Sequence, residues 1–81
     1  MPETPVAAAN WLFDLTMQRY TASDHDRAKT DYFFATAYPL VRDTFDSKKN
    51  REDFIVEVFA SIKSSELGWL QPEPPEFNEP G

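Results

Sequence analysis

The single histidine is the first residue of this chain that could carry chemistry. His25 stands between two carboxylates in Asp24-His25-Asp26, and these residue types bind metal ions or transfer protons. Adjacent residues of a helix point in different directions, so the three side chains do not converge on one site. Zinc would need further nitrogen or sulfur ligands, and the sequence has one histidine and no cysteine. We therefore expect a solvated helical turn here, with no metal, no cofactor and no catalytic residue.

A cluster of charged residues between positions 42 and 53 is the second candidate. Its acidic members are Asp43, Asp46, Glu52 and Asp53, and its basic members are Arg42, Lys48, Lys49 and Arg51. A calcium loop needs oxygen ligands at alternating positions around a central glycine, and basic residues occupy those places. A DNA-recognition helix needs basic or amide groups on its outer face, where we expect Asp53 and Glu57. The cluster therefore predicts a charge-balanced connection between two helices.

Overall charge and composition argue against several other functions. The net charge is -6, whereas phosphate binding requires a basic face, so we expect no direct nucleic-acid binding and no attachment to an anionic membrane. Glycine occurs only at Gly68 and Gly81, which leaves no glycine-rich phosphate loop, and nothing indicates a small-molecule substrate. Residues 1–5 resemble neither a signal peptide nor a membrane anchor, so the cytoplasm is the expected compartment.

Apolar residues recur at helical spacing in three segments, which predicts an all-α fold. The first helix covers residues 6–22, with Thr4 as its N-cap and Pro5 at its first position. We expect the second helix to start with Ser23 as its N-cap. Asp24 then lies in the first turn, where the helix dipole favours negative charge.

The second helix carries a proline within its stripe of expected core residues, which are Phe33, Phe34, Ala37, Tyr38, Val41 and Phe45. Pro39 lacks an N–H group and its ring crowds the preceding turn. We expect the helix to be kinked or split there, and favour a kink because Tyr38 is a poor N-cap. Asn50 is the predicted N-cap of the third helix, with Asp53 three residues later as in a capping box. Gly68 is the expected left-handed residue that ends this helix.

The first helix is apolar on two opposite sides, whereas a small monomeric bundle needs one apolar side per helix. The side expected in the core consists of Val6, Ala9, Phe13, Met17 and Tyr20. The opposite side carries Ala8, Trp11, Leu12, Leu15 and Ala22. The second apolar side therefore predicts a further contact, within this chain or with another.

Runs of three large side chains indicate the same surplus of apolar surface. Trp11-Leu12-Phe13 and Tyr32-Phe33-Phe34 each span about 200° of a helix, more than one core easily takes. Tyr32 lies opposite the stripe of its helix and should face solvent. Aromatic residues are enriched at protein interfaces. We therefore predict a protein-binding surface made of Ala8, Trp11, Leu12, Leu15, Tyr32 and Trp69.

An intramolecular alternative stays open for the surface around Trp11. Trp69 and Leu70 follow the third helix and precede a proline-rich segment, so this end of the chain could fold back over Trp11. A kink at Pro39 that makes a bundle of four segments could also bury it. Neither solution needs a partner.

The composition changes at residue 71. Residues 71–81 contain four prolines and three glutamates, a composition typical of disordered or extended chain. We therefore predict a helical domain at residues 1–70, folded as a small three-helix bundle, and an acidic proline-rich tail at residues 71–81.

The sequence favours a small acidic protein–protein interaction module without catalytic activity. It either self-associates or serves as a small subunit or adaptor of a larger complex, so its partner is another protein or a second copy. The alternative is an acidic inhibitor or regulator that blocks the basic site of a nucleic-acid-binding protein. The carboxylates available for that role are Glu52, Asp53, Glu57 and the glutamates of the tail.

Overall fold

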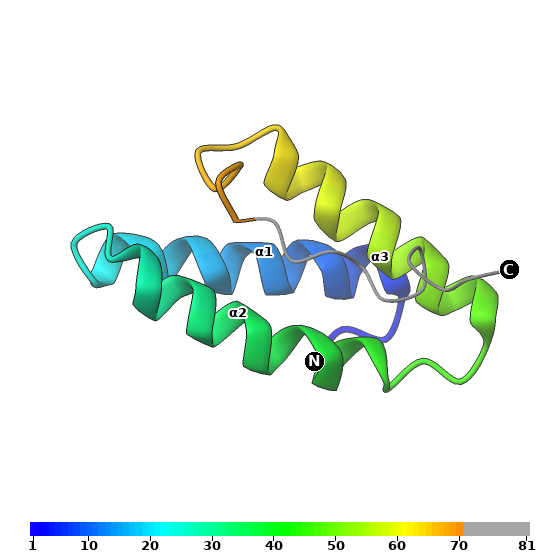
Figure 1. Ribbon diagram of the computed structural model, residues 1–81. Helices are drawn as coiled ribbons and strands as arrows, with labels where there is room; N and C mark the ends of the chain where they lie inside the picture. The colour runs from blue at the N-terminus through cyan, green and yellow to red at the C-terminus, as the bar shows by residue number, and fades with distance from the viewer. Residues whose placement is uncertain (71–81) are drawn as a thin grey trace, which may run out of the picture.

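Three α-helices make up the described part of the chain, residues 1–70 of the computed structural model. They are α1 (Pro5–Ala22), α2 (Arg27–Arg42) and α3 (Lys48–Lys63), and these residues contain no strand. In Figure 1, α1 and α2 lie side by side in opposite directions, while α3 lies at an angle to them. The predicted all-α three-helix fold is confirmed. The predicted tail lies outside the described residues.

The start of α1 follows the sequence signals. The Oγ1 atom of Thr4 accepts a hydrogen bond from the backbone N–H of Ala7 at 3.3 Å, and Pro5 opens the helix. This satisfies one of the free N–H groups of the first turn, and the proline has no N–H to leave unpaired.

The turn between α1 and α2 differs from the prediction, because the N-cap of α2 lies three residues later than Ser23. Its N-cap is Asp26, whose Oδ1 accepts from the backbone N–H of Lys29 at 3.0 Å. Ser23, the predicted N-cap, lies in the turn instead, where its Oγ accepts from the N–H of Asp26 at 3.3 Å. Asp24 and His25 are therefore turn residues. The prediction that they lie in the first turn of the second helix is wrong.

Two consecutive left-handed residues end α1. Asp24 and His25 have φ values of 59° and 62°, and the N–H of His25 donates to the carbonyl of Tyr20 at 2.8 Å. This hydrogen bond closes the last turn of α1 as a left-handed C-terminal residue commonly does. The sequence did not indicate it, because glycine usually occupies such positions and none is present.

Replacement of Asp24 by glycine should stabilise the protein by about 1 kcal/mol. A non-glycine residue in the left-handed region costs about 1–2 kcal/mol, and part of this gain is lost to the larger conformational entropy of glycine in the unfolded chain. The measurement is the free energy of unfolding in urea. As a control, Ala35→Gly at an exposed position inside α2 should destabilise by about 1 kcal/mol. Loss of stability in Asp24→Gly would contradict this backbone geometry.

Pro39 lies inside α2, which is one helix and is not split. A proline there leaves the carbonyl of Ala35 without its usual N–H donor, and Ala35 is exposed, so solvent can replace the missing bond. Pro39 is also close to the end of the helix, where its carbonyl accepts from the N–H of Asp43 at 3.0 Å. A bend of the axis at Pro39 stays a prediction.

The predicted caps of α3 are wrong at both ends. Ser47 is the N-cap, and its Oγ accepts from the N–H of Asn50 at 3.0 Å. Asn50 therefore lies inside the helix, and it forms no capping box with Asp53. The helix ends at Lys63, five residues before Gly68, which is not in the left-handed conformation. Short turns connect the end of α3 to Leu67 and Leu70, and both of these leucines are buried.

The buried residues of α1 form a row that lies between the two apolar sides predicted for this helix. Its buried residues are Ala8, Ala9, Leu12, Thr16 and Tyr20. Ala9 and Tyr20 were expected there, and Phe13 and Met17 are partly buried against the core. Val6 is 48% exposed, so its predicted core position is wrong. Thr16 was not expected in the core, but its hydroxyl donates to the carbonyl of Leu12 at 2.8 Å, which makes burial inexpensive.

Aromatic rings join α2 to α3. The ring of Tyr38 is stacked on Phe54 at 5.8 Å and contacts the edge of Phe59 at 5.3 Å. Phe34 lies 5.4 Å from Tyr38 and 6.0 Å from Phe59. Such offset and edge-on arrangements are favourable for aromatic pairs. Aromatic rings therefore close the side of the bundle that faces α3.

Candidate binding surface

The residues predicted to bind a partner divide between the core and the surface. Ala8 and Leu12 are fully buried, so in the folded protein they cannot reach a partner. Trp11 is 36% exposed and Tyr32 is 75% exposed, as expected for Tyr32. Leu15 is half-buried. The structure therefore leaves Trp11, Leu15 and Tyr32 accessible among the predicted residues of α1 and α2.

Trp69 covers the far end of α1 and not Trp11. Its ring lies 5.7 Å from the ring of Tyr20, and the guanidinium of Arg27 lies 5.1 Å from its centre. Tyr20 is nine residues after Trp11, which is about 13 Å along a helix. Trp69 itself therefore does not cover Trp11. The alternative in which the proline-rich tail wraps back over Trp11 concerns residues 71–81, which lie outside the described residues. The Nε1 atom of Trp69 is buried and has no hydrogen-bond partner among residues 1–70.

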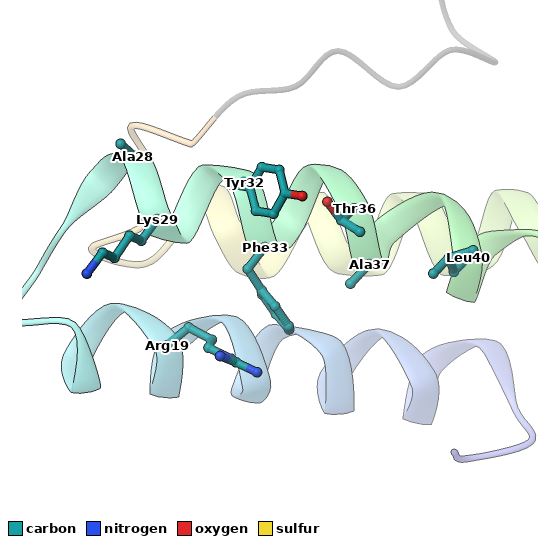
Figure 2. A pocket seen from close by; sticks show the side chains of 8 residues that line it. All are labelled: Arg19, Ala28, Lys29, Tyr32, Phe33, Thr36, Ala37 and Leu40. Atoms are coloured by element: carbon teal, nitrogen blue, oxygen red, sulfur yellow. The ribbon is translucent and has the colours of Figure 1, made fainter.

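A groove of about 650 Å³ lies along the α1–α2 pair. Figure 2 shows its side chains, with α3 behind the pair. The lining residues are Arg19 of α1 and Ala28, Lys29, Tyr32, Phe33, Thr36, Ala37 and Leu40 of α2. Because the rings of Phe34 and Tyr38 contact α3 on the other face, the groove is the side of the α1–α2 pair that no described element covers.

The wall and floor of the groove come from two rows of α2. Tyr32 and Leu40 are eight residues apart, so they lie on one row two turns apart. Both are exposed, at 75% and 68%. Phe33 and Ala37 form the second row, are partly buried and pack against the core. The groove is thus apolar along most of its length.

One end of the groove carries two cations. The guanidinium of Arg19 lies 4.9 Å above the ring of Phe33, and Lys29 follows on the first turn of α2 (Figure 2). No carboxylate of residues 1–70 forms an ion pair with either residue. The contact with the ring holds the Arg19 guanidinium in place by a cation–π interaction, so a positive charge is fixed at this end.

Leu15 and Trp11 continue the row of Arg19 along α1. They precede Arg19 by four and eight residues, and residues four apart share one face of a helix. The accessible part of the predicted surface on α1 therefore shares the helix face of Arg19, although Arg19 is the residue of α1 that lines the groove.

Sequence reasoning did not identify Arg19, Lys29, Thr36 and Leu40 as groove residues. The available signal was the four-residue spacing of Ala28, Tyr32, Thr36 and Leu40, which predicts one exposed row on α2. Phe33 and Ala37 were expected in the core, and they are the partly buried floor of the groove.

Two of the three acidic residues of α3, Glu52 and Asp53, have basic partners on the same helix. Lys48 pairs with Glu52 at 3.9 Å and Lys49 with Asp53 at 3.1 Å. In the preceding connection, the Arg42 guanidinium donates to Asp43 at 2.8 Å and lowers the pKa of that carboxyl. The predicted charge-balanced connection agrees with these pairs. They also reduce the free negative charge available to an acidic inhibitor.

His25 takes no part in a polar cluster in the described residues. Its ring lies 4.7 Å from the ring of Tyr20. Within residues 1–70, no three His, Cys, Asp or Glu side chains are placed to hold a metal ion. Nor does any helix in that range have the length and apolar character needed to cross a membrane.

Comparison of the chain with protein-family models, curated proteins and solved structures gives no match. Function is therefore inferred from the groove itself.

Proposed function

We propose that this protein is a non-catalytic protein-binding module, a small subunit or adaptor, and that the α1–α2 groove is its contact surface. The observation that carries the proposal is the exposure of Tyr32 and Leu40, 75% and 68%, beside an apolar floor. A single exposed apolar residue needs no explanation, whereas a contiguous apolar patch marks an interaction site. Trp11 extends this surface along α1.

The shape of the groove favours a protein over a small molecule. Ala28 and Leu40 lie at its two ends on α2, and twelve residues of helix span about 18 Å. Small-molecule sites enclose most of the ligand and aim several polar groups at it. This groove is open and mostly apolar, with its charged groups, Arg19 and Lys29, at one end only.

A different protein is favoured over a second copy as the partner. The net charge is -6, and two molecules with the same net charge repel one another at low ionic strength. Light scattering of the purified protein distinguishes binding to a different protein from binding to a second copy. If the partner is a different protein, the purified chain should be a monomer. A stable dimer that dissociates in Leu40→Ser would show that the groove binds a second copy.

Photo-crosslinking from the groove tests the proposal in cells of the native host. A photoreactive amino acid at position 40 should give a crosslink to another protein. The matched control is position 56 on α3, because Val56 is also an apolar residue with 57% of its surface exposed. Crosslinks from position 56 but none from position 40 would contradict the proposal.

The crosslinked protein should then bind the purified chain directly, and the groove should determine the affinity. Leu40→Ser should raise Kd by about 10-fold or more, because a buried leucine side chain contributes about 1.5–3 kcal/mol. Val56→Ser should leave Kd unchanged. Equal effects of the two substitutions would exclude the groove as the contact surface.

A further inference from the structure

We infer that the segment bound in the α1–α2 groove is an amphipathic α-helix of about three turns with carboxylates at one end of its apolar stripe. These carboxylates lie against Arg19 and Lys29, and the apolar stripe lies against Phe33, Ala37 and Leu40. This inference rests on the proposed function, since it names the chemistry of the partner that the groove receives.

The groove offers side chains and no backbone hydrogen bonds. A bound strand would leave its own N–H and C=O groups without partners beside a helical surface, whereas a helix satisfies them internally. The groove follows α2 from Ala28 to Leu40, about 18 Å, which a helix of about twelve residues matches. A helix of the partner would cover the exposed side of the α1–α2 pair, as α3 covers the opposite side.

The charges determine which end of the groove receives the carboxylates of the partner helix. Arg19 and Lys29 lie on the half of the groove nearest the start of α2, and Ala37 and Leu40 lie on the other half (Figure 2). Neither cation is paired with a carboxylate of residues 1–70, although acidic residues outnumber basic ones in the sequence by 14 to 8. Arg19 is already positioned on Phe33 at 4.9 Å, so little side-chain entropy is lost when it meets a carboxylate.

Three synthetic peptides of equal length test the inference on the full-length protein. The first is a helical alanine-based peptide with leucines at positions i, i+4, i+7 and i+11 and two glutamates at one end. The second replaces the glutamates by lysines. The third has the composition of the first in shuffled order, so that it has no apolar stripe.

Fluorescence anisotropy gives the affinities, and amide chemical shifts locate the peptide. The acidic peptide should shift the resonances of Tyr32, Phe33 and Leu40, and bind about 10-fold more tightly than the basic peptide, as expected for two partly exposed ion pairs against two repulsive ones. The shuffled peptide should not shift these resonances.

Charge reversal identifies the cations that decide the preference. Arg19→Glu with Lys29→Glu should reverse the order of the acidic and basic peptides. The matched control is Lys48→Glu with Lys49→Glu on α3, which changes the net charge by the same amount and should keep the original order. Circular dichroism checks that both variants remain helical.

Several results would overturn the inference. They are equal affinity for acidic and basic peptides, groove shifts caused by the shuffled peptide, and reversal in the Lys48/Lys49 variant. A change of groove resonances in the free protein on Phe77→Ser would assign the groove to residues 71–81 instead. The first three results leave the groove as a contact surface for another protein. Occupation of the groove by residues 71–81, like absence of a crosslink from position 40, counts against the proposed function itself.

Discussion

Truncation of Phe34 to alanine should destabilise the protein by about 3–5 kcal/mol, the usual cost of removing a buried phenylalanine. Phe34 is fully buried between Tyr38 and Phe59, so its loss leaves a cavity and removes two ring contacts. A protein of 81 residues has a total stability of about 4–12 kcal/mol. The loss therefore amounts to about a quarter or more of the total stability, and circular dichroism with urea titration measures it.

The neighbouring phenylalanine supplies the control. Phe33 lies on the groove and is only partly buried, so Phe33→Ala should cost about 1–2 kcal/mol and leave the protein folded. If Phe34→Ala is too unstable to titrate, Phe34→Leu should still fold at a cost of about 1.5 kcal/mol or less. A larger loss from Phe33→Ala than from Phe34→Ala would mean that α2 is rotated about its axis.

Leu12→Ala should destabilise the protein by about 3 kcal/mol, because Leu12 is fully buried in the middle of α1. The same substitution at Leu40, which is 68% exposed, should change stability by less than about 0.5 kcal/mol. The two variants thus separate folding from recognition with one chemical change: the first lowers stability and the second lowers partner affinity. Free energies of unfolding from urea titration provide the comparison.

If Leu12→Ala left the free energy of unfolding unchanged, Leu12 would be exposed, as the sequence-predicted binding surface requires. That result would also contradict the placement of the core row of α1. Dimerisation of the wild type, abolished by Trp11→Glu, would show instead that the exposed surface around Trp11 binds a second copy of the chain.

The all-α fold class and the number of helices could be predicted from the sequence, because the spacing of apolar residues determines both. The cap at Thr4 was also predictable, since proline follows it. Other caps were not, because serine, asparagine and aspartate are nearly equivalent in this role. Ser23 and Asp26 are three residues apart, as are Ser47 and Asn50, and local propensity does not choose between the members of each pair.

The position of the core row on α1 depends on the other two helices. Spacing gave α1 two apolar sides, but the buried row passes between them through Thr16, which a count of apolar residues omits. Burial of this threonine requires a hydrogen bond to its own helix, and that bond becomes visible only in the structure.

The groove could not be predicted because it belongs to no single helix. Leu40 stands outside the core stripe of α2 and gives no signal alone. Leu40 lines the groove because α1 lies beside this face of α2 and α3 packs on the opposite face. Arg19 enters the site from a different helix, ten residues before Lys29, and only the antiparallel packing of α1 and α2 brings them together.

The two buried threonines have a consequence for how the helices are aligned. Thr16 donates to Leu12 and Thr30 donates to Asp26, each within its own helix or helix cap. Neither hydroxyl reaches across an interface, so neither fixes how far one helix slides along the next. That register depends instead on interlocking shapes, and the rings of α2 and α3 contribute to them. A substitution that preserves ring volume but changes ring shape should therefore broaden the set of packed states before it unfolds the chain.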